Sequence, residues 1–294
     1  MVGFGSDGAR PSEAAMLDRL LADLRSTTPP SADPRWRQLA LHAGFLAYAL
    51  TAPLFHRTAA QYAAGVAATV AADLLLQFAR ERRVYFPLSA VITSFGIQLL
   101  CRAPSPWIYA ALGAAAMAAK NLIRFRGRHA FNPSNAVLVA SLLLLPPGLV
   151  AVPSDWGGSA AGLAVVAAAG VVVVALAGRL ALVAAYLASF LAGALLRHAA
   201  LGLPLAEALA PTASPIFPIF AFFMLTDPRT TPVGARDCVL FGLLLGAVET
   251  FLRAAGADGA PFYALFVMTL AEAVFPSAFG ASAPRAAGAT CPSS

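Results

Sequence analysis

Two stretches of the chain carry polar side chains in patterns that suit ligand binding. The first covers residues 124–135 and ends in Phe-Asn-Pro-Ser-Asn. Asn132 before Pro133 is typical of a helix start, because proline tolerates the first turn and asparagine caps free backbone N–H groups. A helix N-terminus beside Arg128 is also a natural site for a phosphate. Two interpretations stay open: a capped helix beside ordinary basic residues, or a binding site that includes Asn132, Ser134, Asn135 and Arg128.

The second stretch covers residues 211–232. Pro215 and Pro218 break a helix inside an apolar run, and such a break is tolerated at membrane depth only where it is buried in protein or lines a cavity. Four aromatic rings that could stack on a flat ligand accompany the break: Phe217, Phe220, Phe222 and Phe223. The stretch then offers hydroxyls, a carboxylate and a guanidinium at Thr226, Asp227, Arg229 and Thr230. An Asp-Pro turn explains part of this pattern, but the combination favours a binding site.

Three acidic residues stand alone inside apolar runs: Asp73, Glu249 and Glu272. Acids at such positions are functional candidates, because a charge inside a membrane is costly. Each could relay a proton or bind a cation in an ion pathway, or pair with a neighbouring arginine. The chain has no HExxH, Walker, GxSxG or Rossmann motif, and its three cysteines are far apart. We therefore assign no catalytic residue and no metal site.

The composition indicates an integral membrane protein. Hydrophobic residues make up 59% of the 294 residues and charged residues only 12%, about half the charged share of a soluble domain, roughly 25%. The formal charge of +6 is spread in short basic clusters between apolar runs. Such clusters are typical of cytoplasmic loops, so we expect a lipid bilayer as the main partner and no nucleic acid.

The positions of the apolar runs predict an all-α transmembrane bundle. A spanning helix needs about 20 mostly apolar residues, and about ten runs qualify when shorter, Pro- and Gly-interrupted ones are admitted. We place them near residues 38–54, 60–79, 84–101, 105–121, 134–152, 159–177, 180–198, 212–226, 237–254 and 261–277. Residues 38–277 would form this transmembrane domain, preceded by a cytoplasmic segment at 1–37 and followed by a flexible tail at 278–294. The first segment contains a short amphipathic helix that starts near Ser12.

The distribution of Lys and Arg predicts the orientation of this bundle. With the amino terminus inside, basic residues gather in the inner loops, at Arg80, Arg82, Arg83, Lys120, Arg124, Arg126, Arg128, Arg179, Arg229 and Arg236. The outer loops hold only Arg57, Arg102, Arg197 and Arg253. The bias predicts a multi-pass protein of the cell membrane with both termini in the cytoplasm.

Four segments resemble a known family. They are residues 87–96 (PLSAVITSFG), residues 103–109 (APSPWIY), the stretch from Lys120 to FNPSN at 131–135, and residues 223–232 (FMLTDPRTTP). Together they resemble the RnfD/NqrB membrane subunits, which carry flavins in ion-pumping redox complexes built from about ten spans. The resemblance covers residues 38–277 and is nearest to the UnbU-type proteins, which are associated with enediyne antibiotic gene clusters.

The resemblance implies a function as a transmembrane electron-transport subunit. It implies that Asn132, Asn135, Thr226, Asp227 and Arg229 line a flavin (FMN or riboflavin) and that soluble redox partner proteins supply electrons. Family members that attach FMN covalently use a threonine in a Ser-Gly-Ala-Thr motif on an outer loop. The one Gly-Ala-Thr here, ending at Thr290, follows the last predicted span, so we expect a non-covalent flavin. The alternative is a small-molecule transporter or self-resistance protein that uses this fold without a redox cofactor.

Overall fold

The computed structural model describes residues 13–51, 58–125, 128–129, 131–152, 160–227, 230–232 and 234–275. Within these residues the protein is almost entirely helical, which confirms the all-α prediction. The strands in the described part are one short antiparallel hairpin, β1 (Arg124–Phe125) and β2 (Arg128–His129). The helices are α1 (Glu13–Ser26), α2 (Pro34–Thr51), α3 (Ala59–Glu81), α4 (Leu88–Leu100), α5 (Pro106–Leu122), α6 (Pro133–Leu144), α7 (Ala160–Leu176), α8 (Leu180–Leu201), α9 (Leu205–Leu209), α10 (Ile216–Ile219), α11 (Ala235–Ala254) and α12 (Ala260–Val274).

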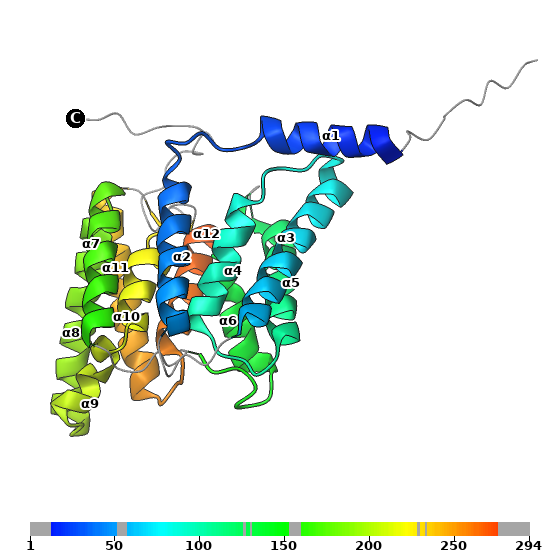
Figure 1. The fold of residues 1–294 in the computed structure, drawn as a ribbon. Coiled ribbons are helices and arrows are strands. Elements are labelled where there is room, and N and C mark those ends of the chain that lie inside the picture. The colour runs from blue at the N-terminus through cyan, green and yellow to red at the C-terminus, as the bar shows by residue number, and fades with distance from the viewer. Residues whose placement is uncertain are drawn as a thin grey trace, which may run out of the picture.

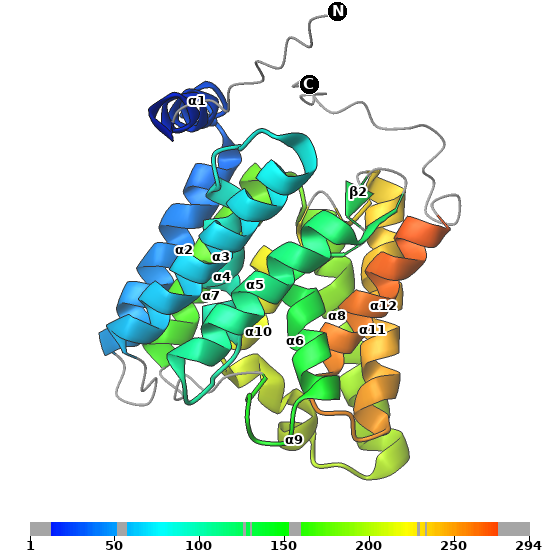
Figure 2. The same cartoon turned by 90° about the vertical axis from the view of Figure 1, so that its right-hand side faces the viewer.

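The helices after α1 form one bundle with two sets that pack in the same order (Figures 1 and 2). In the first set α3 packs along α5, α2 packs on α4, and α6 lies beside α5. In the second set α8 packs along α11, α7 packs on α10, and α12 lies beside α11. The first set begins at the end of the bundle that carries α1, whereas α7 begins at the other end. The two sets are therefore inverted relative to each other.

Small residues allow the two main helix pairs to approach closely. A Cβ at Gly113 of α5 would overlap the Thr69 hydroxyl of α3, and a Cβ at Gly193 of α8 would overlap Thr250 of α11. Gly242 of α11 lies directly against the backbone of α8. Close contact through small residues is characteristic of helices that associate in lipid. The Ala- and Gly-rich composition thus has a packing role in both sets.

The chain crosses the bundle repeatedly, so its connections lie at two ends. We call the end that carries α1 the α1 face; α3, α5 and α12 end there and α4, α6, α8 and α11 begin there (Figures 1 and 2). The described basic residues of the predicted inner loops are all in segments at this face: Arg80, Arg82, Arg83, Lys120, Arg124, Arg128, Arg179 and Arg236. The opposite face is the end where α2, α6, α8 and α11 finish.

Helix lengths and apolar composition indicate membrane association. Among the described residues, α3 and α8 are long and apolar enough to cross a membrane. A third span is counted if the bent pair Leu205–Ala213 and Ile216–Met224 forms one. The helices α4, α6, α7 and α12 are apolar but shorter than 18 residues.

Each predicted apolar segment contains a helix, and two segments depart most from their predicted ranges. The segment predicted at 134–152 stops being helical at Leu144, because Pro146 and Pro147 follow at once and cannot continue a helix. The segment predicted at 212–226 starts earlier and is broken. Its two parts meet at an angle of 65° near Pro215, and residues Phe220–Met224 form a π-helical turn. Proline and π-turns are the usual causes of such kinks.

Candidate functional site

The two polar stretches singled out in the sequence meet at the α1 face. Asn132 caps α6: its side-chain oxygen accepts a hydrogen bond from the Asn135 N–H at 3.2 Å, and Pro133 occupies the first turn. The Asn132 amide then donates to the Asp227 carboxylate at 3.2 Å, across 95 residues of sequence. We call this meeting point, formed by residues 132–135, 226–227 and 230–231, the Asn132–Asp227 junction. It confirms the prediction of a capped helix start and joins it to the Thr-Asp-Pro turn.

Local hydrogen bonds hold the carboxylate at the junction. The Thr226 hydroxyl donates to the Phe222 carbonyl at 2.7 Å, which continues the helix before the turn. The Asp227 carbonyl accepts from the Thr231 hydroxyl at 2.7 Å and from the Thr230 N–H at 3.2 Å. These bonds leave the Asp227 side chain directed at α6. The hydrogen bonds to the Asp227 carbonyl therefore support a polar contact between the two sets of helices.

Two buried oxygen atoms beside this contact have no hydrogen-bond partner among the described residues. They are Oδ1 of Asn135, a residue with no exposed surface, and Oγ1 of Thr230, a residue that is 3% exposed. The Asn135 amide nitrogen is satisfied by the Phe262 carbonyl at 3.1 Å. An unpaired buried polar atom costs about 1–3 kcal/mol. A bound molecule with hydrogen-bond donors would satisfy both oxygens.

The other predicted residues of this site are Ser134, Arg128 and Arg229. Ser134 is buried and donates to the Thr93 carbonyl at 3.2 Å, so it fastens α6 to α4. Arg128 contributes backbone to β2, but its side chain lies outside the described residues, as does the whole of Arg229. The predicted flavin contacts of both arginines therefore stay predictions.

The four phenylalanines of the broken helix do not face a common site. Phe222 packs against Gly170 of α7, and Phe223 makes edge contact with Phe45 at 5.4 Å between ring centroids. Both are core residues. Phe217 and Phe220 instead line a pocket below the bend.

This pocket lies toward the opposite face of the bundle, where α11 ends and α12 begins. It has an empty volume of about 550 Å³, part of it open to the surroundings. Its walls are mostly apolar and include one charged side chain; they are formed by Pro211, Ser214, Ile216, Phe217, Phe220, Arg253, Gly259, Pro261 and Phe262. The mostly apolar lining with one charged group is typical of small-molecule sites.

A buried polar network lies behind the pocket wall. Arg253 forms an ion pair with Glu249 at 2.7 Å, one turn earlier on α11, and Glu249 is 1% exposed. The other Glu249 oxygen accepts a hydrogen bond from the Tyr186 hydroxyl at 2.8 Å. Nearby on α8, Arg197 is buried and donates to the Ala208 carbonyl, while its Nε has no partner among the described residues.

The first set of helices has its own buried ion pair, near the α1 face. Asp73 of α3 lies 3.2 Å from the Lys120 ammonium of α5, and it accepts a further hydrogen bond from the Asn121 amide at 3.1 Å. Lys120 also donates to the Ser89 hydroxyl at 2.6 Å. Pairing with a neighbouring arginine, one of the two interpretations left open for the isolated acids, describes Glu249. Asp73 pairs with a lysine instead.

The three acids are not gathered in one place. Asp73 lies near the α1 face and Glu249 behind the pocket, and Glu272 is buried on the last turn of α12. In the described ranges no group of three or more His, Cys, Asp or Glu side chains could hold a metal ion. A continuous ion pathway through these residues stays a prediction.

Comparison with known proteins adds no relative. No family model matches the chain, and a search of the curated proteins found no match. Function therefore has to be argued from the chain's own residues.

Sequence reasoning offered pairing with a neighbouring arginine for Glu249 but missed two longer-range contacts. Glu249 and Arg253 are four residues apart on one helix, so their pairing was readable from the spacing. Lys120 and Asp73 are 47 residues apart and Tyr186 and Glu249 are 63 apart, and nothing local signals either contact.

Proposed function

We propose that the protein is a membrane subunit of an RnfD/NqrB-like electron-transport system that holds a flavin non-covalently at the Asn132–Asp227 junction. The hydrogen bond between Asn132 and Asp227 carries the proposal, because it joins the two motifs on which the family resemblance depends. The unpartnered oxygens of Asn135 and Thr230 support it. A flavin ring carries N–H and carbonyl groups in one plane, which match amide, hydroxyl and carboxylate side chains.

We further propose that the bundle has ten membrane-spanning segments and that it begins and ends on the cytoplasmic side of the membrane. Leucines with large exposed areas cover the flanks of the helices, as Leu75 (69% exposed), Leu144 (80%) and Leu196 (61%) show. A soluble protein does not expose so much apolar surface. The concentration of basic residues at the α1 face supports its placement in the cytoplasm.

The flavin would supply the redox chemistry, and this chain would position it. The Asn132 amide and the Asp227 carboxylate would orient the polar edge of the ring, with Asn135 and Thr230 accepting from its N–H groups or from ordered water. The surrounding core, which includes Phe131 stacked near Phe266 at 5.0 Å, limits the access of water to this region. The electron donors would be soluble partner proteins.

A visible absorbance spectrum of detergent-purified protein tests the proposal. We expect a flavin band that is released on denaturation, and a lower flavin content in Asp227→Asn and Asn132→Ala with an unchanged size-exclusion profile. Asp18→Asn, at an exposed carboxylate on the same face, is the matched control. Full flavin content in both junction variants would remove these residues from the site. Colour that stays with the denatured chain and is lost in Thr290→Ala would show covalent attachment instead.

The bend between Leu205–Ala213 and Ile216–Met224 favours a second function, small-molecule transport. A broken helix beside a pocket is a recurring arrangement in transporters built from inverted repeats, and Phe217, Phe220 and Arg253 line such a pocket here. A colourless but monodisperse preparation would make transport the first hypothesis. Uptake or export assays in vesicles with Arg253→Gln would then be the next experiment.

A further inference from the structure

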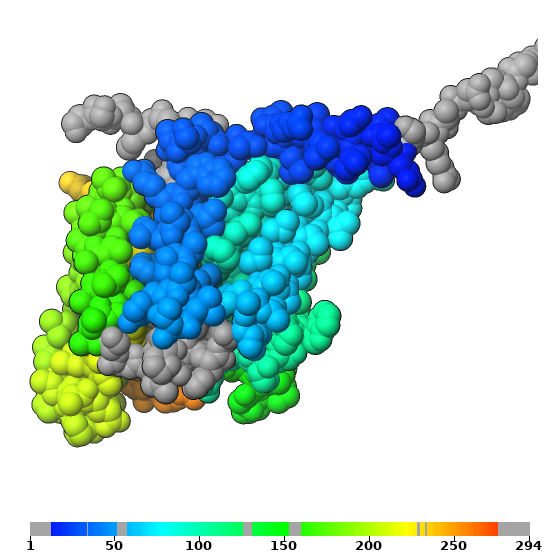
Figure 3. Space-filling view, in the orientation of Figure 1, coloured from blue at the N-terminus to red at the C-terminus, as the bar shows by residue number. Residues whose placement is uncertain are grey.

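The first helix lies across the α1 face and does not join the core. None of its residues is buried. In Figures 1 and 3 it runs perpendicular to the bundle over the end of α3, and its first turn reaches past the edge of that helix. Figure 2 shows it nearly end-on above the outer flank of the bundle. It therefore occupies the place where a surrounding bilayer would have its interface.

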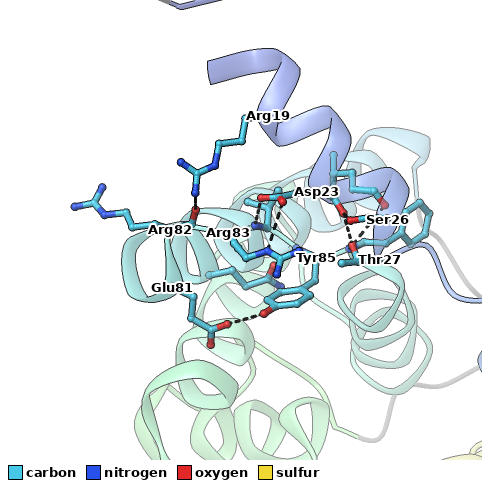
Figure 4. Close-up of polar contacts among 12 residues, drawn as sticks. Arg19, Asp23, Ser26, Thr27, Glu81, Arg82, Arg83 and Tyr85 are labelled. Carbon is cyan, nitrogen blue, oxygen red and sulfur yellow. Dashed lines mark hydrogen bonds and ion pairs between the residues drawn. The ribbon is translucent and has the colours of Figure 1, made fainter. Parts of the chain in front are cut away.

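One side of α1 is fastened to the turn between α3 and α4 (Figure 4). The Asp23 carboxylate lies 3.4 Å from the Arg83 guanidinium and accepts from the Val84 N–H at 3.4 Å. The Arg19 guanidinium donates to the Arg82 carbonyl at 3.2 Å. Just past the helix, the Thr27 hydroxyl accepts from the Phe86 N–H at 2.9 Å. These contacts fix the orientation of α1 about its own axis.

The apolar side chains of α1 are adjacent to this fastened side and remain uncovered. Met16 is 44% exposed, Leu17 is 56% exposed and Leu21 is 41% exposed. At 100° per residue they form one stripe with Leu20 and Leu24, next to Arg19 and Asp23 on the helix circumference. A stripe of this kind is unfavourable when it faces water, because burying one such side chain stabilises a protein by about 1.5–3 kcal/mol.

We propose that α1 is an interfacial helix that lies in the cytoplasmic surface of the bilayer, with Met16, Leu17 and Leu21 inserted among the acyl chains. Arg25 is exposed and lies next to Leu21 on the helix circumference, where its guanidinium would meet lipid phosphates. The lipid surface is favoured over a protein partner because α1 stands at the outer flank of the bundle. The helix α3, which leads into the turn that holds α1, also exposes apolar side chains such as Leu75. This inference rests on the proposed placement of the bundle in a membrane.

Spin labels in reconstituted protein test the inference. In a background with the three native cysteines replaced by alanine, single cysteines are introduced as Leu17→Cys, Ala22→Cys and Leu191→Cys. Leu17 lies on the apolar stripe, Ala22 is exposed on the other side of α1, and Leu191 is 49% exposed on α8. Each label is probed by collision with oxygen, which concentrates in lipid, and with a water-soluble nickel complex.

We expect the label at position 17 to collide mainly with oxygen and the label at 22 mainly with nickel, in the full chain in phospholipid vesicles. Nickel access at both α1 positions, with oxygen access at 191, would overturn the interfacial placement while leaving the bundle in the membrane. An immobilised label at 17 that neither reagent reaches would overturn it in favour of a protein partner on α1. Nickel access at 191 would refute the membrane placement itself, and this inference with it.

Discussion

Separating Asp73 from Lys120 tests whether the buried acid of α3 has a structural role. Asp73 is 1% exposed and the Lys120 side chain 14% exposed, so either charge left alone would be mostly desolvated. Removing one partner of a buried pair costs about 3–5 kcal/mol, whereas replacing both with apolar residues is often neutral. We expect Asp73→Leu or Lys120→Met alone to lower the free energy of unfolding by about 3 kcal/mol. This is the low end of the range because the Lys120 side chain is partly exposed to solvent. The double variant should return to within about 1 kcal/mol of the parent protein.

The assay is a double-mutant cycle on the free energy of unfolding, measured by denaturant titration in mixed micelles. Asp33 and Arg35 provide a matched control, since this pair is 2.7 Å apart but its arginine side chain is 36% exposed. Exposed pairs couple by about 0–1 kcal/mol. If the Asp73 and Lys120 variants were additive within about 0.5 kcal/mol, the ion pair would have no structural role. The carboxylate would then be free for the ion pathway predicted from the sequence.

Two further predictions concern helix packing and the α3–α4 turn. Gly113→Ala should destabilise the protein by about 1–3 kcal/mol, because the new Cβ would overpack against Thr69. Gly44→Ala is the control: a Cβ there meets nothing within 4 Å, so this change should be neutral or slightly stabilising. Thermal unfolding in detergent compares the two variants. The hydrogen bond and negative charge of Glu81 raise the pKa of Tyr85 above that of an ordinary tyrosine. Because the folded-state pKa is the higher one, this contact stabilises the fold below the ordinary tyrosine pKa and is lost as the pH rises through the raised value. Glu81→Gln should lower that pKa in an ultraviolet titration of phenolate absorbance, with Tyr85→Phe identifying the band; an unchanged pKa would contradict the contact.

The sequence predicted the helical class and most helix positions, because apolar runs and their Pro and Gly breaks are local signals. It also identified both halves of the Asn132–Asp227 junction, since Asn-Pro and Thr-Asp-Pro are unusual in apolar surroundings. It could not show that they touch, because their contact depends on how α6 packs against the end of the broken helix. The pocket was only half predicted: Phe217 belongs to the noted aromatic cluster, but Arg253 comes from a different helix.

The inverted arrangement of the two sets was not predicted either. It depends on which helices pair, and no residue pattern of a single helix reports that. The broken helix shows the same limit. Pro215 signals an interruption, but it predicts neither the 65° angle nor the packing of residues 216–224 against α7 and α8.

The pairing of α3 with α5 also constrains how the protein is made. Lys120 follows Asp73 by 47 residues, with α4 between them. At about 5–20 residues per second, the ribosome delivers the lysine roughly 2–9 s after the aspartate. In the proposed membrane placement, α3 would carry an uncompensated acid during that interval, and a lone charge inside lipid is costly. In that placement, the first set of helices would reach its final packing only after α5 emerges, because only then can Lys120 pair with Asp73.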